Sequence, residues 1–137
     1  MDTLTREKRS WNMSRIRSAD TGPEKLVRSL LHRMGFRFRL HSAGLPGRPD
    51  IVLPKYSTVV LVHGCFWHRH ARCKYVYTPK SRKDFWERKF RQNVRRDRLV
   101  RQELRKLGWK VIVVWECQTR HPERLAARLE RLITAPG

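Results

Sequence analysis

The sequence predicts an α/β fold in which a mixed sheet is flanked by helices. Helical and extended patterns alternate along the 137 residues in the order helix, three strands, helix, strand, helix. Apolar residues recur with a helical period in some segments and form short β-branched runs in others. A chain of this length with 39% hydrophobic residues can bury one core. Such a domain covers its sheet with helices.

The first firm helix is expected over residues 21–35. Asp20 and Thr21 are N-cap candidates, Pro23 suits the first turn, and Gly35 ends the segment. One apolar stripe predicts its buried face, formed by Leu26, Val27, Leu30, Leu31 and Met34.

The later elements follow from the same periodicities and from their flanking Gly and Pro residues. Alternation of Phe36, Phe38 and Leu40 with Arg predicts a half-buried strand, and the segment from Ser42 to Pro49 reads as a loop. The other predicted elements are strands at 50–53, 58–62 and 110–115, an irregular segment at 63–78, and helices at 81–107 and 121–133. Residues 1–20 are basic and polar, and we expect an N-terminal arm there, outside a single domain at 21–137.

The charge balance indicates a polyanionic partner. Lys and Arg number 32 against 12 Asp and Glu, so the net charge is +20. This excess is far beyond what solubility needs, and nucleic acid is the commonest partner of such proteins. No run of 18 apolar residues could span a membrane, and the start of the sequence lacks the apolar core of a signal peptide. We therefore expect a cytoplasmic protein.

The three cysteines point to a metal. They are Cys65, Cys73 and Cys117, an odd number that cannot be paired entirely within the chain. The segment 63–73 also holds three histidines, and Zn²⁺ takes four sulfur or nitrogen ligands. The thiols would supply three ligands and one histidine the fourth, although the residues alone leave open which histidine. The alternative is three buried thiols beside scattered surface histidines.

A carboxylate and the histidines that a zinc site would leave over are candidates for catalysis. Asp50 stands at the entry to a predicted strand, and the next strand ends at His63, so the sheet can bring them together. A carboxylate at a strand end is a usual ligand for Mg²⁺. An Asp after Pro is by itself more often a turn residue, so this interpretation depends on its neighbours.

Three aromatic residues are candidates for a wedge that enters DNA. Phe66 and Trp67 lie in the irregular segment, and Trp86 lies on the long basic helix. A loop held by metal is poorly placed to bury two adjacent aromatics, but it is well placed to push them between base pairs. The alternative is that these residues pack in the core. For Trp86 the sequence favours neither interpretation over the other.

At this point the chain resembles the very-short-patch repair (Vsr) DNA mismatch endonucleases, from about residue 5 to 133. The resemblance is carried by groups of residues that follow one another in order: Arg9-Ser10 with Met13-Ser14, Asp20-Thr21 with Pro23-Glu24, Pro46-Gly47-Arg48-Pro49-Asp50, His63-Gly64-Cys65-Phe66-Trp67-His68, Asn93-Val94 with Arg96-Asp97, and Trp115-Glu116-Cys117. Each group alone is a weak signal, but their order is specific.

The resemblance implies a restriction-endonuclease-like fold with one structural zinc site. It also implies a bacterial, nucleoid-associated enzyme that acts as a monomer on double-stranded DNA, alongside other repair proteins. With Mg²⁺ it would nick one strand on the 5′ side of the thymine in a T:G mismatch, which starts the repair of deaminated 5-methylcytosine.

The resemblance also assigns residues. Asp50 and the backbone carbonyl of Val62 would bind Mg²⁺, while His63 and His68 act at the scissile phosphate, with His68 the preferred general base. The remaining residues carried over share supporting roles: Glu24 and Asp97 at the active site, Cys65, His70, Cys73 and Cys117 at zinc, and Phe66, Trp67, Trp86, Met13, Arg9 and Arg48 toward DNA.

Two positions depart from the family's pattern. Val62 stands where Thr is common, and the gap from His70 to Cys73 is one residue longer than usual. Two other functions remain open from the residues: a nuclease of the same fold that acts on undamaged DNA, and a non-catalytic zinc-stabilised module that binds nucleic acid. The set of Asp50, His63 and His68 distinguishes an enzyme from such a module.

Overall fold

The computed structural model describes residues 21–136. The predicted arm at 1–20, with Arg9 and Met13, lies outside the described residues. The elements follow the predicted order and are α2 (Gly22–Arg33), β1 (Arg39–Leu40), β2 (Ile51–Leu53), η1 (Pro54–Tyr56), β3 (Thr58–His63), α3 (Lys83–Lys106), β4 (Lys110–Trp115), η2 (Glu116–Arg120) and α4 (Pro122–Thr134).

The described strands form one mixed sheet in the order β1-β2-β3-β4. β1 and β2 pair antiparallel, as do β2 and β3, whereas β3 and β4 run parallel. The parallel pair needs a long crossover between its strands, and α3 supplies it. β3 is buried along almost its whole length, as its apolar β-branched sequence predicts for a central strand. The prediction of a mixed sheet is confirmed.

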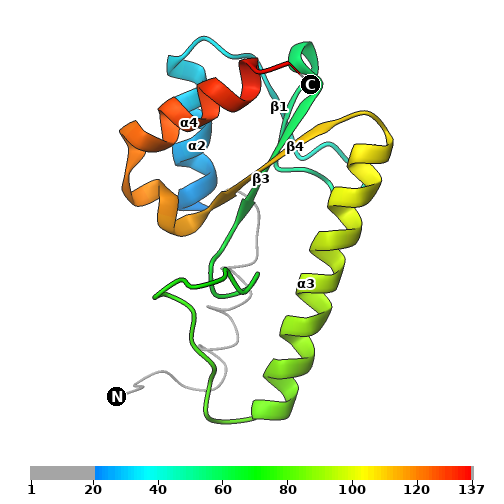
Figure 1. The fold of residues 1–137 in the computed structure, drawn as a ribbon, viewed down its shortest axis with the longest axis vertical. Coiled ribbons are helices and arrows are strands. Elements are labelled where there is room, and N and C mark those ends of the chain that lie inside the picture. Colours follow the sequence, from blue (N-terminus) through cyan, green and yellow to red (C-terminus); the bar gives the residue numbers. More distant parts are fainter. Residues whose placement is uncertain (1–20, 137) are drawn as a thin grey trace.

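Helices cover both faces of the sheet (Figure 1). α2 and α4 lie side by side on one face, where the larger core includes Leu31, Leu129 and Ile133. Leu104 of α3 packs on the other face, against Val52 and Val59. None of the helices in this described part of the chain is long and apolar enough to cross a membrane. The rest of α3 runs beyond the sheet edge and carries exposed positions (Figure 1).

The expected strand at 36–40 is wrong over most of its length, since only Arg39 and Leu40 pair with β2. The amide of Phe36 donates to the carbonyl of Leu31, and the amide of Gly35 to the carbonyl of His32. With Gly35 at φ +84°, these bonds form the Schellman motif that ends α2. The backbone of Phe36 thus belongs to the helix end, while its ring packs edge-on against Tyr56.

Gly47 sets the path of the loop that leads to Asp50. It has φ +71°, a left-handed conformation that favours glycine. A Cβ there would lie 2.6 Å from Cγ1 of Val100, so the loop backbone passes directly over α3. Pro49 is fully buried next to Asp50. This contact anchors the predicted metal ligand between the sheet and the long helix.

Candidate active site

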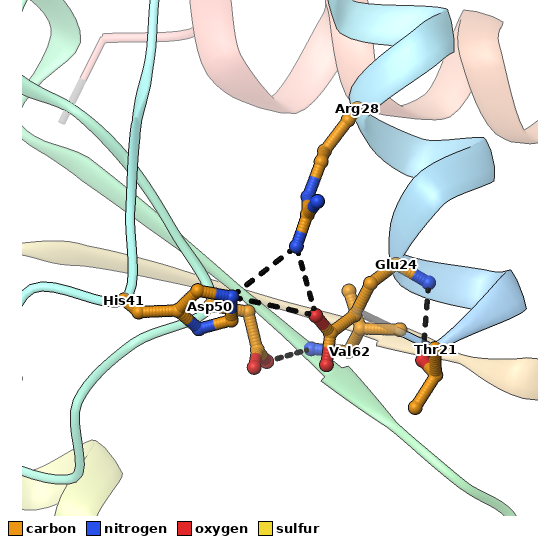
Figure 2. Close-up of polar contacts among 6 residues, drawn as sticks. All are labelled: Thr21, Glu24, Arg28, His41, Asp50 and Val62. Carbon is orange, nitrogen blue, oxygen red and sulfur yellow. Dashed lines mark hydrogen bonds and ion pairs between the residues drawn. The ribbon is translucent and has the colours of Figure 1, made fainter. Parts of the chain in front are cut away.

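Asp50 and Glu24 form a carboxylate pair at the edge of the sheet (Figure 2). Asp50 lies just before β2, and its Oδ2 accepts a hydrogen bond of 2.8 Å from the amide of Val62 in β3. Glu24 lies in the first turn of α2, where Thr21 caps the helix by accepting from the Glu24 amide. The sheet and the helix start therefore bring together two residues that are 26 positions apart in sequence.

Sequence reasoning missed two residues at this pair. Arg28 Nη2 donates to Glu24 Oε2 at 3.2 Å and lies 3.2 Å from Nε2 of His41 (Figure 2). His41 Nε2 is itself 3.8 Å from Glu24 Oε2. Arg28 follows Glu24 by four positions in a helix, a spacing that predicts their contact. Nothing in the sequence around His41 marks it out, because its position depends on the β1–β2 pairing.

The electrostatics of the pair favour a bound cation. Burial and, secondarily, the charge of Glu24 raise the pKa of Asp50 to about 6, against the hydrogen bond from Val62. Glu24, His41 and Asp50 each offer a ligand atom, and these atoms all lie within 4.8 Å of one another. Two carboxylates supply the oxygen ligands that Mg²⁺ prefers, and a cation would relieve their repulsion. The residues present therefore fit a divalent metal.

A histidine pair stands at the end of β3. The rings of His63 and His68 are stacked, with centroids 4.0 Å apart and 6° between their planes. Nδ1 of His68 lies 2.6 Å from Oδ2 of Asp97 on α3. A carboxylate in this position fixes the ring so that Nε2 faces away from Asp97 and is free to exchange a proton. The structure thus brings together three of the predicted catalytic residues.

The two histidines differ in their surroundings. Burial and the neighbouring His68 lower the pKa of His63 to about 3, so His63 is neutral at physiological pH. Its buried Nδ1 has no hydrogen-bond partner within residues 21–136. A buried polar atom of this kind indicates an exchangeable ligand, water or substrate. His68 is the more exposed ring and the one oriented by a carboxylate.

The four predicted zinc ligands come together in one cluster. Ligand atoms of Cys65, His70, Cys73 and Cys117 all lie within 4.8 Å of one another. Nδ1 of His70 is 3.7 Å from Sγ of Cys65 and 3.5 Å from Sγ of Cys117. Tetrahedral Zn²⁺ would separate such sulfur and nitrogen atoms by about 3.6 Å. The longer gap before Cys73 is accommodated with Arg72 in a left-handed turn at φ +57°.

The cluster's surroundings suit a metal that displaces protons. Burial raises the pKa of the Cys65 thiol to about 12 and also raises that of Cys117. Thiols of this kind ionise only when a cation supplies the missing charge. Burial lowers the pKa of His70, which keeps its ring neutral and able to coordinate. The donor set and its geometry therefore fit Zn²⁺.

An aromatic cluster joins the irregular segment to α3. It consists of Phe66, Trp67, Tyr77, Trp86 and Phe90. Asn93 of α3 donates to the carbonyl of Trp67, and the guanidinium of Arg69 lies 3.9 Å over the ring of Phe90. These contacts fold the segment against the helix, so the two predicted wedge segments form one unit.

The expectation that this loop does not bury Trp67 is wrong. Its side chain is only 9% exposed, since Phe66 and Trp86 pack against it. Phe66 and Trp86 are partly buried, whereas Tyr77 is 62% exposed and stacks on Phe66. The sequence did not show that α3 offers this loop an apolar surface. Arg48, predicted to contact DNA, is exposed beside Asp50.

Comparison with known proteins places this chain in a family. The family model described as DNA mismatch endonuclease Vsr matches residues 1–75. The chain is 48% identical over 132 residues to the type II nicking enzyme V.XorIIP of Xanthomonas oryzae pv. oryzae, covering 96% of each chain. It is also 48% identical over 132 residues to V.NmeAIP of Neisseria meningitidis, covering 96% of this chain and 94% of that one.

A third relative carries the family's name. The chain is 43% identical over 141 residues to the DNA mismatch endonuclease Vsr of Escherichia coli, covering 99% of this chain and 90% of the relative. These matches extend over nearly the whole chain and are not confined to single motifs. The chain therefore belongs to the Vsr family of DNA mismatch endonucleases and is a DNA endonuclease, a hydrolase of phosphodiester bonds.

Proposed function

We propose that this endonuclease uses Mg²⁺ to nick one strand 5′ of the thymine in a T:G mismatch. The observation that carries the proposal is that the carboxylate pair of Asp50 and Glu24 lies beside the end of β3, where His63 stacks on His68. Val62 links the two groups, since its amide binds Asp50 and the next residue is His63. Family membership excludes the alternative of a non-catalytic binding module.

The residues divide the chemistry of hydrolysis among them. Asp50, the backbone carbonyl of Val62 and, more remotely, Glu24 would hold Mg²⁺, which when bound stabilises negative charge on the phosphate. His68, oriented by Asp97, would move the proton of the attacking water, since its ring is partly exposed and held by the carboxylate. Neutral His63 would hydrogen-bond at the scissile phosphate. Replacement of Thr by Val62 leaves its backbone carbonyl unchanged.

The Cys–His cluster would hold one structural Zn²⁺ through Cys65, His70, Cys73 and Cys117. The ion would fix a segment that contains no helix or strand between β3 and α3. We further propose that the mixed sheet with helices on both faces is the restriction-endonuclease-like fold, and that the enzyme acts on DNA as a monomer. Other repair proteins would act with it.

The experiment that tests the proposal compares duplexes that differ at one base pair. Labelled T:G and T:A duplexes of the same sequence would be incubated with Mg²⁺ or with EDTA. We expect a nick only with Mg²⁺, 5′ of the mismatched thymine, at a rate roughly 10- to 100-fold higher for T:G because unstacking a mismatch costs less. Equal rates on both duplexes would instead support a nuclease for undamaged DNA.

The aromatic cluster would recognise the mismatch by entering the base stack. Trp67→Ala should reduce affinity for T:G DNA by about 10- to 100-fold, the effect of one stacked aromatic, while affinity for matched DNA changes less. Because Trp67 is buried, insertion would require the cluster to open. Exposed Leu99→Ala on α3 lies outside the cluster and should leave discrimination unchanged. Binding would be measured by fluorescence anisotropy beside a thermal melt. A folded Trp67→Ala protein that still discriminates T:G from T:A would remove Trp67 from recognition.

A further inference from the structure

A basic cavity of about 430 Å³ opens beside the Cys–His cluster. Residues of the irregular segment form one wall, and η2 with the start of α4 forms the other. Its cationic lining is Arg72, Lys74, Arg120, Arg124 and Arg128. None of the predicted catalytic or wedge residues lines it. The roles assigned above leave this concentration of charge unexplained.

The charge of the cavity exceeds what the neighbouring cluster needs. Of the residues that the structure describes, no Asp or Glu lines the cavity, although Glu116 and Glu123 lie close by in the chain. Three thiolates around one Zn²⁺ would carry a net charge of −1, which one arginine would balance. Four cations would remain to face solvent. Such an excess, enclosed in a concave site, attracts and holds an anion.

The cavity also offers ordered donors. The guanidinium of Arg120 lies 4.3 Å over the ring of Tyr75, which holds it in place at its exposed position. α4 begins at the rim, and no side chain caps its first turn, so backbone N–H groups there are available to an anion. The planar guanidinium of an arginine fixed in this way can donate to two phosphate oxygens at once.

The cavity lies one strand away from the catalytic histidines. His63 at the end of β3 pairs in register with Trp115 of β4, and such strands are about 4.8 Å apart. Trp115 contacts His63 edge-on at 5.3 Å and stacks on His70 at 4.1 Å. His70 in turn lines the cavity. A DNA strand that crosses the sheet edge from β3 toward β4 therefore reaches the cavity.

From these observations we infer that the cavity binds a backbone phosphate of the substrate DNA, on the β4 side of the cut. The inference rests on the proposed function, because it requires the scissile phosphate at His63 and His68. Phosphate contacts of this kind fix the register of a duplex without reading its sequence. The cavity would thus position the strand so that the nick falls at one bond.

The test pairs two double variants that lose equal charge. Arg120→Ala/Arg124→Ala removes two cavity arginines, and Arg33→Ala/Arg105→Ala removes two exposed arginines at the C-terminal ends of α2 and α3, outside every proposed site. Affinity for a T:G duplex would be measured without Mg²⁺ from about 50 to 200 mM salt. The cavity variant should bind about tenfold more weakly, and its log–log salt slope should fall by about 1 to 2. The control variant should keep the wild-type slope.

Neutral methylphosphonates placed one at a time along the nicked strand would locate the contact. Wild type and the control variant should lose affinity about tenfold at one or two positions where the cavity variant loses none. If both double variants behave alike, the inference is wrong. It is also wrong if the cavity variant keeps wild-type affinity for DNA, a result that would favour an acidic protein as the partner of the cavity. Wild-type protein that neither binds nor nicks the duplex would instead overturn the proposed function.

Discussion

Replacing Asp50 with Asn should lower Mg²⁺-dependent nicking by more than about 100-fold, because the proposed metal site loses one of its two carboxylates. The Asn side-chain oxygen can still accept the hydrogen bond from the amide of Val62, so the loop keeps its position. DNA affinity should stay within about tenfold, or roughly 1.4 kcal/mol, since the basic surface supplies most of the binding. Nicking of a labelled T:G duplex and anisotropy measure the two effects.

The same substitution should make the metal-free protein more stable. The pKa of Asp50 is raised to about 6 in the folded chain, above its unfolded value of about 3.9, so the folded state favours the protonated form. The stabilising effect of the protonated carboxyl is complete below about pH 4 and is lost as the pH rises through about 6, which leaves a cost of roughly 3 kcal/mol at pH 7. Asn carries no charge and avoids this cost, so the melting temperature should rise by a few degrees.

Asp84→Asn is the control for Asp50→Asn. Asp84 is exposed in the first turn of α3 and belongs to none of the proposed sites. It should keep wild-type nicking and gain no stability. An Asp50→Asn enzyme that nicks at the wild-type rate would remove this carboxylate from the mechanism, whatever its effect on melting.

Loss of one thiol from the Cys–His cluster should have the second large effect. Purified wild-type protein should contain one Zn²⁺ per chain, and Cys117→Ser should hold less and unfold at a clearly lower temperature. Structural zinc in small domains contributes about 10–16 kcal/mol, which is comparable with the whole stability of a domain this size. Elemental analysis and a thermal melt measure the outcome.

His121→Ala is the matched variant for the zinc prediction. His121 is exposed and is not one of the four clustered ligands, although it follows Cys117 by four positions and lines the same cavity. Its replacement should leave zinc content and melting unchanged. Soluble, freshly purified wild-type protein without zinc would contradict the assignment, and equal zinc in the Cys117→Ser protein would exclude Cys117 as a ligand.

Local sequence patterns predicted the order of the elements and most of their bounds. The apolar stripe of α2 and the β-branched run of β3 depend on residues close together in the chain, so they were readable without the fold. The strand expected at 36–40 failed because Phe36 bonds back to Leu31 to end the helix. Alternation alone cannot distinguish a helix cap from a strand when both place one aromatic ring inward.

Members of the candidate site could be predicted where the residue type and its spacing alone indicate a role. Asp50 and the cysteines stand out as ligands in any context, whereas His41 becomes relevant only once β1 pairs with β2 and brings it near Glu24. The burial of Trp67 depends on α3 lying alongside the irregular segment. That contact spans many residues, and no local pattern in the sequence encodes it.

The parallel pairing of β3 with β4 has a consequence for how the chain folds. Cys65 and Cys117 are 52 residues apart and meet only after the whole α3 crossover has closed. Closing such a loop lowers the entropy of the chain before the contacts between β3 and β4 can stabilise it, and this slows folding. A metal held across that junction would act as a crosslink on the unfolded chain. The rate at which the end of β3 assembles with β4 would then depend on metal binding. The nuclease would stay inactive until Cys65 and Cys117 had met.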